Sequence, residues 1–188
     1  MNRREAISAV AVLLGGTIVG SDMFLSGCKN VEKKEGALSF DKDQIALLDE
    51  IAETIIPATT SPGAKAAKVG EFMTVMVKDC YEDKNQKVFM DGLKKLQDAS
   101  DKKYDKSFMQ ADANQRHNLL VELDKEQKEY TKNKKTDEPT HYFRMMKELT
   151  LLGYFTSEVG ATQALRYVDI PGKYEGCIPY KKGDKAWA

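Results

Sequence analysis

The sequence has few of the residue types from which active sites are built. Its 188 residues include two histidines, three cysteines and one tryptophan. It has no HExxH, CxxC or CxxCH motif, no glycine-rich phosphate loop and no GxSxG turn. These absences exclude the usual zinc protease, thiol redox, haem-attachment, nucleotide-binding and serine hydrolase sites. We therefore expect no catalytic, cofactor-binding or metal-binding residue in this chain.

An excess of charge of either sign is also missing. Lys plus Arg and Asp plus Glu each number 29, so the formal net charge is zero and nucleic acid is not an expected partner. The lysine run 132–135 is followed by Asp137 and Glu138, which predicts a solvated loop. A charged fraction of 31% with only five prolines is typical of a soluble helical domain.

The two histidines and the adjacent acids have helical spacings that do not indicate a metal or acid–base site. Glu138 precedes His141 by three residues, but a di-metal bundle site needs this spacing twice and His117 has Asn114 in the matching position. Each histidine is predicted at the surface or at a helix end. The acidic pairs Asp49/Glu50 and Asp124/Glu126 are expected on solvated helix faces.

The N-terminal segment has the layout of an export signal. Arg3 and Arg4 precede an apolar stretch, residues 6–19, that is too short for a permanent transmembrane helix. Leu25-Ser26-Gly27-Cys28 resembles the lipobox of bacterial lipoproteins. We predict a signal peptide over 1–27, using either the general or the twin-arginine route, and a lipidated flexible tether over 28–38 that begins at Cys28. No second segment is apolar enough to span a membrane.

Residues 39–188 are predicted to form an all-α fold, an irregular bundle of about five helices with an extended C-terminal tail. Apolar residues recur at steps of three and four, and no convincing strand pattern occurs. Asp41 with Gln44 and Asp112 with Gln115 match capping boxes. The predicted helices run from Asp41 to Ile56, from Ala64 to Tyr81, from Gln86 to Ala99, from Asp112 to Tyr130, and from Pro139-Thr140 through Gly153.

Two features of this domain are not explained by a helical core. Cys80 and Cys177 are the only thiols left if Cys28 is acylated, and in an oxidising compartment they would form an internal disulfide, stay free, or bond to a partner. The segment from Ile170 to Trp187 is rich in Gly, Pro and aromatic residues. Such a segment either wraps its own bundle or docks on another protein.

Several motifs resemble the gluconate 2-dehydrogenase subunit 3 family, over nearly all of the chain from about Ser39. They are residues 48–57 (LDEIAETIIP), 61–67 (SPGAKAA) and 147–160 (KELTLLGYFTSEVG), together with Tyr167, Pro171, Gly172, Tyr174, Gly176 and Cys177. None of these motifs is a catalytic signature.

The resemblance implies a non-catalytic accessory subunit of an exported, flavin-dependent sugar or polyol dehydrogenase. It implies that the FAD lies in the large partner subunit, that a cytochrome c subunit can accompany it, and that the small subunit assists maturation and export. With a lipobox, we expect this chain on the periplasmic side of a bacterial cell envelope, lipid-anchored. The residues expected to contact the partner are Tyr154, Phe155, Tyr174, Tyr180 and Trp187. The alternative is an independent envelope lipoprotein that binds a small ligand or has a structural role.

Overall fold

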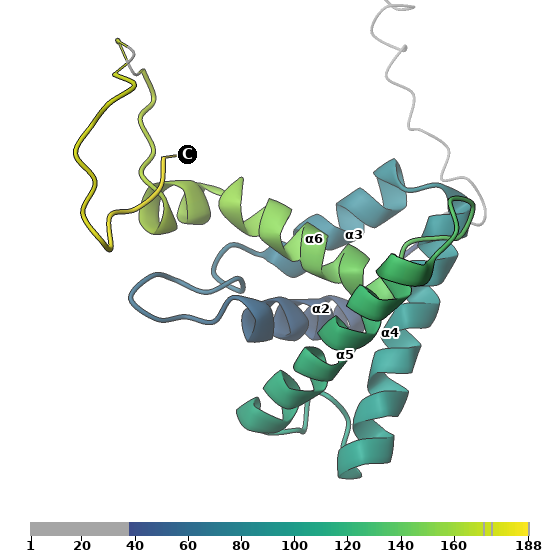
Figure 1. Ribbon diagram of the computed structural model, residues 1–188. Helices are drawn as coiled ribbons and strands as arrows, with labels where there is room; N and C mark the ends of the chain where they lie inside the picture. Colours follow the sequence, from purple (N-terminus) through teal and green to yellow (C-terminus); the bar gives the residue numbers. More distant parts are fainter. Residues whose placement is uncertain (1–37, 171, 174, 188) are drawn as a thin grey trace, which may run out of the picture. The chain divides into compact units, whose positions relative to one another are not determined.

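The computed structural model describes residues 38–170, 172–173 and 175–187, and in this part of the chain all regular structure is helical (Figure 1). The helices are α2 (Lys42–Ile55), α3 (Val69–Cys80), α4 (Asp83–Tyr104), α5 (Ala113–Asn133) and α6 (Tyr142–Phe155), followed by a short π-helix, η1 (Gly160–Ala164). The predicted all-α fold is therefore confirmed. None of the described helices has the length and apolar character needed to cross a membrane.

Both predicted capping boxes are present. The Asp41 carboxylate accepts the backbone N–H of Gln44 at 2.7 Å, and the Gln44 side chain accepts the N–H of Asp41. Asp112 and Gln115 make the same reciprocal pair at the start of α5. These side chains satisfy N–H groups that have no partner within the helix, which is why helices begin where they were predicted.

Other predicted boundaries are wrong by a few residues. The second helix begins at Val69 rather than Ala64, because Lys68 adopts a left-handed conformation (φ 52°) that a continuous helix does not allow. The third extends beyond both predicted ends, from Asp83 to Tyr104, and is followed by the cap residue Asp105, which is also left-handed. The fourth continues to Asn133, into the segment predicted as a loop. The last begins at Tyr142, capped by His141.

Helix α6 is the centre of the bundle and contacts each of the other described helices. Its buried residues supply much of the core: Tyr142, Phe143, Met145, Met146, Leu149, Thr150, Gly153 and Tyr154. Figure 1 shows α2 and α3 beside α6, with α4 and α5 crossing them. Phe108, which precedes α5, is also fully buried, and its N–H is accepted by the Gln97 side chain. A single core of this kind is expected for a domain of this size.

Candidate protein interface

The described residues contain no cluster of His, Cys, Asp and Glu that could hold a metal ion. His117 lies exposed on α5, whereas His141 is almost fully buried at the first turn of α6. The Nδ1 atom of His141 accepts the N–H of Phe143 at 3.2 Å, so this histidine caps a helix. Each histidine therefore lies at the surface or a helix end, and the two do not share a site.

The carboxylates of α2 do not lie on a solvated face, which corrects the prediction for Asp49 and Glu50. Asp49 accepts the N–H of Gly70 at 2.7 Å, at the start of α3. Burial raises the pKa of Asp49, partly offset by this hydrogen bond. The Glu50 carboxylate is largely buried and pairs with both Lys65 and Arg116. These acids join α2 to the α2–α3 loop, to α3 and to α5.

A third acid, Glu53, shapes the α2–α3 loop. Its two carboxylate oxygens accept the N–H groups of Ala58 at 3.0 Å and Lys65 at 2.8 Å, one on each side of the loop tip. A methyl group on Gly63 would lie 2.2 Å from Glu53 Oε1, so glycine is required for this close approach. The loop is therefore held in one conformation by side chains from α2.

Tyr154 fixes the same loop from the other side. Its hydroxyl donates to the carbonyl oxygen of Pro62, and its ring is only 1% exposed. Tyr154 is therefore a core residue, and the prediction that it contacts a partner is wrong. Its neighbour Phe155 is 39% exposed on the outer face of α6. Tyr154 faces inward because its hydroxyl binds the Pro62 carbonyl. Helical spacing alone does not predict this long-range contact.

The turn after α6 is equally close-packed. Ser157 Oγ donates to the carbonyl of Tyr154 and accepts the N–H of Gly160. A methyl group on Gly160 would lie 1.8 Å from the Tyr154 carbonyl oxygen, so the backbone can pass here only without a side chain. The α2–α3 loop and the end of α6 thus form one connected surface.

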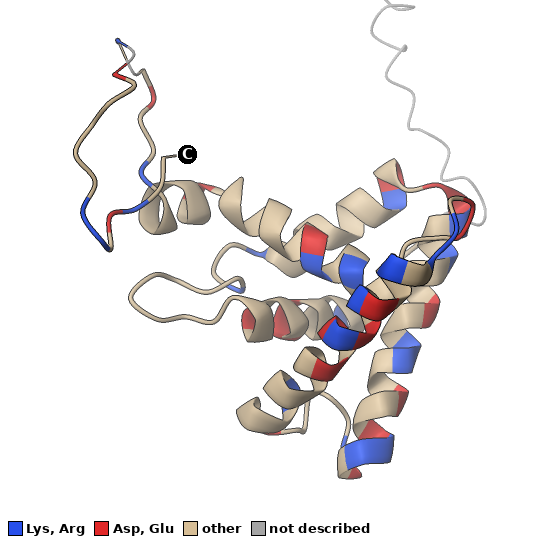
Figure 2. Ribbon diagram, viewed as in Figure 1, with Lys and Arg blue, Asp and Glu red and all other residues tan. Residues whose placement is uncertain are grey.

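Two stretches of this surface carry almost no charge, although Glu53, Lys65 and Lys68 lie beside them. Residues 54–64 contain no charged side chain and residues 149–165 contain only Glu158, in a chain that is 31% charged. We call these two ranges together the uncharged end; Figure 2 shows charged residues gathered mainly on α4 and α5 instead. Leu151, Leu152 and Phe155 are exposed there. Loss of charge combined with exposed apolar side chains is typical of the centre of a protein–protein interface.

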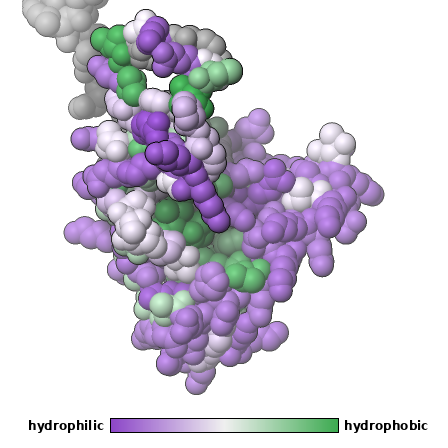
Figure 3. Space-filling view, turned by 60° about the vertical axis from the view of Figure 1, so that its left-hand side comes forward, coloured by the Kyte–Doolittle hydropathy of each residue, from purple (hydrophilic) through white to green (hydrophobic). Residues whose placement is uncertain are grey.

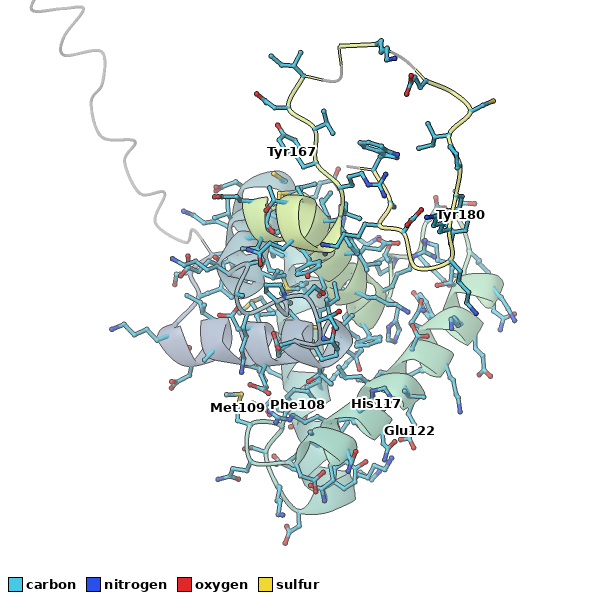
Figure 4. All side chains as sticks on the ribbon, turned by 90° about the vertical axis from the view of Figure 1, so that its left-hand side faces the viewer. Phe108, Met109, His117, Glu122, Tyr167 and Tyr180 are labelled. Carbon is cyan, nitrogen blue, oxygen red and sulfur yellow. The ribbon has the colours of Figure 1, made fainter. Side chains whose placement is uncertain are left out.

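The C-terminal segment does not wrap the bundle, so the wrapping alternative is wrong for the described residues. Its described residues beyond Arg166 are exposed, including Ile170 (81%), Tyr180 (76%) and Trp187 (54%). Figure 4 shows Tyr167 and Tyr180 on the two arms of a loop that stands away from the helices. In Figure 3, apolar side chains occur on this segment and on the bundle below it. We call residues 166–187 the C-terminal loop.

The base of the C-terminal loop is closed by contacts between its two ends. The Arg166 guanidinium lies over the Trp187 ring, 4.7 Å from the ring centroid. The Arg166 N–H donates to the carbonyl of Ala186 at 2.8 Å, in an isolated parallel bridge with Trp187. The Lys185 ammonium donates to the carbonyl of Gln163, in η1. The loop therefore begins and ends beside the uncharged end.

Comparison with known proteins identifies the family. The profile of the family described as gluconate 2-dehydrogenase subunit 3 matches residues 42–172, well over half of the chain. This chain belongs to the gluconate 2-dehydrogenase subunit 3 family. Neither a curated protein nor a solved structure gives a match. The name of the family describes one subunit of a dehydrogenase complex, which supports association with other subunits.

The range matched to the gluconate 2-dehydrogenase subunit 3 family contains all of the uncharged end. Three residues of the motifs quoted above have a structural role: Glu53 and Tyr154 hold the α2–α3 loop, and Gly160 permits the turn after α6. The sequence prediction missed the loop as part of the surface. The sequence pattern that could have indicated this surface is the near absence of charge in residues 54–64 and 149–165.

The other predicted sites of this family member remain predictions. Cys80 and Cys177 are both free and exposed in the structure, so the disulfide that would join them is not formed there. Phe155, Tyr180 and Trp187 are accessible to a partner. Tyr174 lies outside the described residues, and so do Arg3, Arg4 and Cys28.

Proposed function

We propose that this chain is a non-catalytic accessory subunit of an exported, flavin-dependent sugar or polyol dehydrogenase, and that it binds the large subunit through the uncharged end and the C-terminal loop. The observation that carries the proposal is the uncharged end, a surface with a single charged side chain whose backbone is held by hydrogen bonds to Glu53 and Tyr154. Family membership supplies the class of complex.

Leaving the apolar side chains of this surface in water is unfavourable. Burial of exposed apolar surface is favourable by about 25 cal/mol per Å². A large part of the side-chain surface is exposed in Leu152, Phe155, Ile170 and Trp187. Aromatic residues near the centre of an interface contribute most of its binding energy. A partner that covers the uncharged end and the C-terminal loop would bury these groups together.

A role in maturation follows from linkage. A subunit that binds only the folded form of its partner stabilises that form, by an amount that grows with its concentration relative to the dissociation constant. In this proposal the large subunit carries the FAD, and a cytochrome c subunit can be its further partner. The present chain helps the large subunit to fold and to be exported, and holds it at the membrane.

The test is to purify the tagged full-length protein from its own host under gentle extraction. We expect a large subunit with a flavin absorbance spectrum to be recovered with it. Phe155→Glu places a charge in the proposed contact and should reduce recovery of that subunit at least tenfold. The control is Val121→Glu, which makes the same kind of change at an apolar residue of α5 exposed to a similar extent, and should not reduce recovery.

Truncation after Ile170 removes most of the C-terminal loop without touching the core. The truncated chain should stay folded and lose the partner. Recovery of the full-length protein alone, colourless and monomeric, would contradict the proposal. If the proposed partner dehydrogenase were also exported normally in a strain that lacks this chain, the independent envelope lipoprotein would be the better account.

Tethering is tested separately, at Cys28. The leucine, two small residues and cysteine at 25–28 predict that this thiol carries the lipid. Two or more acyl chains hold a protein firmly at a membrane, whereas one holds it only weakly. A fatty-acid probe should label the wild-type protein and not Cys28→Ala, and the variant should move from the membrane to the soluble fraction. Equal labelling of both proteins would contradict lipidation at this position.

A further inference from the structure

Two open cavities adjoin each other on the surface where α5 meets α6. One, of about 320 Å³, lies between the C-terminal part of α5 and α6. The other, of about 300 Å³, lies earlier along α5 and is also lined by Ile55 of α2. Lys128 and Lys147 line both cavities, so the two are neighbours. We call the two cavities together the α5–α6 groove.

Positive charge is concentrated in the α5–α6 groove. Its lining contains five cationic side chains but only two acidic ones, Asp124 and Glu148. The formal net charge of the whole chain is zero, so this excess is local. The cationic residues are Lys125, Lys128, Lys132, Arg144 and Lys147.

Two of these cations converge on one acid. The Asp124 carboxylate lies 2.6 Å from the Lys147 ammonium and 2.7 Å from the Lys128 ammonium. Lys128 is on α5 and Lys147 on α6, so the carboxylate brings like charges together across the junction of the two helices. A single negative charge does not neutralise both. The middle of the groove therefore keeps a positive charge.

The other lysines of the groove are not neutralised within it. Lys125 and Lys132 form no ion pair with the described residues. With Lys128 they have the spacing i, i+3 and i+7, which places all three on one face of α5. The remaining acids of α5 line neither cavity; they are Glu122, Glu126 and Glu129.

Apolar side chains lie between the cations. They come from all three helices and are Ile55, Leu120, Val121, Phe143 and Leu151. Val121 is 39% exposed and Leu151 is 40% exposed. Leu120 of one cavity and Gln127 of the other are seven residues apart on α5, so the cavities are about 10 Å apart. Two turns of a helix in a partner have the same length.

The extended segments of this chain do not have the charge that would complement the groove. In the C-terminal loop, residues 166–187, Lys and Arg number five against three Asp and Glu. In the predicted tether, residues 28–38, they number three against two. Both segments are therefore basic, as the groove is. An occupant with complementary charge must come from another molecule and must be acidic.

We propose that the α5–α6 groove binds an acidic amphipathic helix of another protein. Apolar side chains about seven residues apart in that helix enter the two cavities, and its carboxylates pair with Lys125, Lys128 and Lys132. A helix is favoured over anionic lipid because headgroups present a flat surface that would leave both cavities unfilled. Phe155 lines neither cavity, so this proposal does not depend on the proposed function.

The test is fluorescence anisotropy with purified full-length protein in detergent and a labelled helical peptide. The peptide has about 15 residues, with leucine at the spacings i, i+3, i+4 and i+7 and glutamate elsewhere, a length of about 22 Å. We expect saturable binding. The same peptide with glutamine in place of glutamate, and the same peptide with serine in place of leucine, should each bind at least tenfold more weakly.

Three variants test the charges of the groove. Lys132→Glu should weaken peptide binding at least fivefold. The control is Lys94→Glu, at an exposed lysine of α4 that lines neither cavity, and it should bind as the wild type does. Asp124→Asn removes the acid shared by Lys128 and Lys147 and should tighten binding at least threefold. Circular dichroism establishes that each variant is folded.

Two further variants separate this proposal from the proposed function. Val121→Glu places a charge in the groove and should weaken peptide binding at least fivefold while the large subunit is still recovered. Phe155→Glu should have the opposite pair of effects. Absence of saturable binding, equal binding of the glutamate and glutamine peptides, or unchanged binding in Asp124→Asn would each overturn the proposal.

A membrane contact is the other outcome of the test. Since the predicted lipid anchor would insert into any bilayer, vesicles of phosphatidylglycerol are mixed with the Cys28→Ala protein. We expect no binding that Lys132→Glu removes. Vesicle binding that depends on Lys132, in a protein that does not bind the peptide, would overturn the proposal in favour of anionic lipid.

Discussion

The hydroxyl of Tyr154 donates a 2.5 Å hydrogen bond to the carbonyl oxygen of Pro62, although the two residues are 92 positions apart in the chain. The bond connects the buried end of α6 to the tip of the α2–α3 loop. Tyr154→Phe keeps the ring and leaves the carbonyl without this partner, which should lower the free energy of unfolding by about 1–2 kcal/mol. Chemical denaturation measures it. Tyr167→Phe removes an exposed hydroxyl and should change stability by less than about 0.5 kcal/mol.

Gly160→Ala should destabilise the turn after α6. Its new methyl group would lie 1.8 Å from the Tyr154 carbonyl oxygen, so the backbone must move, at a cost of about 1–3 kcal/mol. Because the shift occurs within the uncharged end, recovery of the partner should also fall. Ala161→Ser adds one oxygen to the next residue and serves as the control. A denaturation midpoint equal to that of the control would show that the turn is not tightly packed.

Stability should fall in acid through Asp124. Burial alone would raise the pKa of Asp124, but hydrogen bonds from Lys128, Lys147 and Gln127 outweigh it and lower the pKa from 3.8 to about 2. The folded state therefore favours the ionised carboxylate. Its contribution is complete above about pH 4 and is lost as the pH falls towards 2.

The comparison for this prediction is Asp124→Asn, measured by urea denaturation across the pH range. In acid, the free energy of unfolding of the variant should fall by about 1 kcal/mol less than that of the wild type. The difference is modest because Lys128 and Lys147 both reach solvent. From pH 5 to 7 the carboxylate is ionised in both folded and unfolded chains, so wild type and variant should change in parallel. Parallel curves below pH 4 as well would contradict the assignment.

The single tryptophan, Trp187, reports the closure of the C-terminal loop. The Arg166 guanidinium covers its ring, a contact worth about 0.5–1 kcal/mol at an exposed site. Arg166→Met should increase quenching of Trp187 fluorescence by acrylamide and shift the emission to longer wavelength. Lys182→Met removes a charge elsewhere in the same loop and should leave both unchanged. Equal quenching in all three proteins would show that the loop is open without the substitution.

Local signals in the sequence were sufficient for the fold class and for two helix starts. Asp41 and Asp112 act within three residues of themselves, so their capping boxes are visible in the sequence. The start of α3 was not, because the left-handed backbone of Lys68 is imposed by the loop that Glu53 and Tyr154 hold. The π-helical turn at Gly160 depends on close packing of its backbone against the Tyr154 carbonyl six residues earlier, which no periodic pattern predicts.

The candidate site was predictable only in part. Phe155, Tyr180 and Trp187 were identified because aromatic residues in an irregular segment are conspicuous, and they are exposed. Tyr154 was assigned to the surface because adjacent residues of a helix cannot be sorted into inner and outer faces without knowing which neighbour covers them. The sequence predicts Asp49 and Glu50 in solvent because their partners, Gly70 and Arg116, lie on other helices and leave no local signal.

The contact between Arg166 and Trp187 also affects the entropy of binding. Bringing together the ends of a flexible segment of this length costs about 3 kcal/mol, and here that ordering happens when the chain folds. The C-terminal loop is therefore preorganised before binding. When a partner contacts both of its arms, the loop loses less conformational freedom than an open segment would. Cutting the backbone between Lys181 and Lys182 should consequently weaken partner binding even though every contacting side chain is still present.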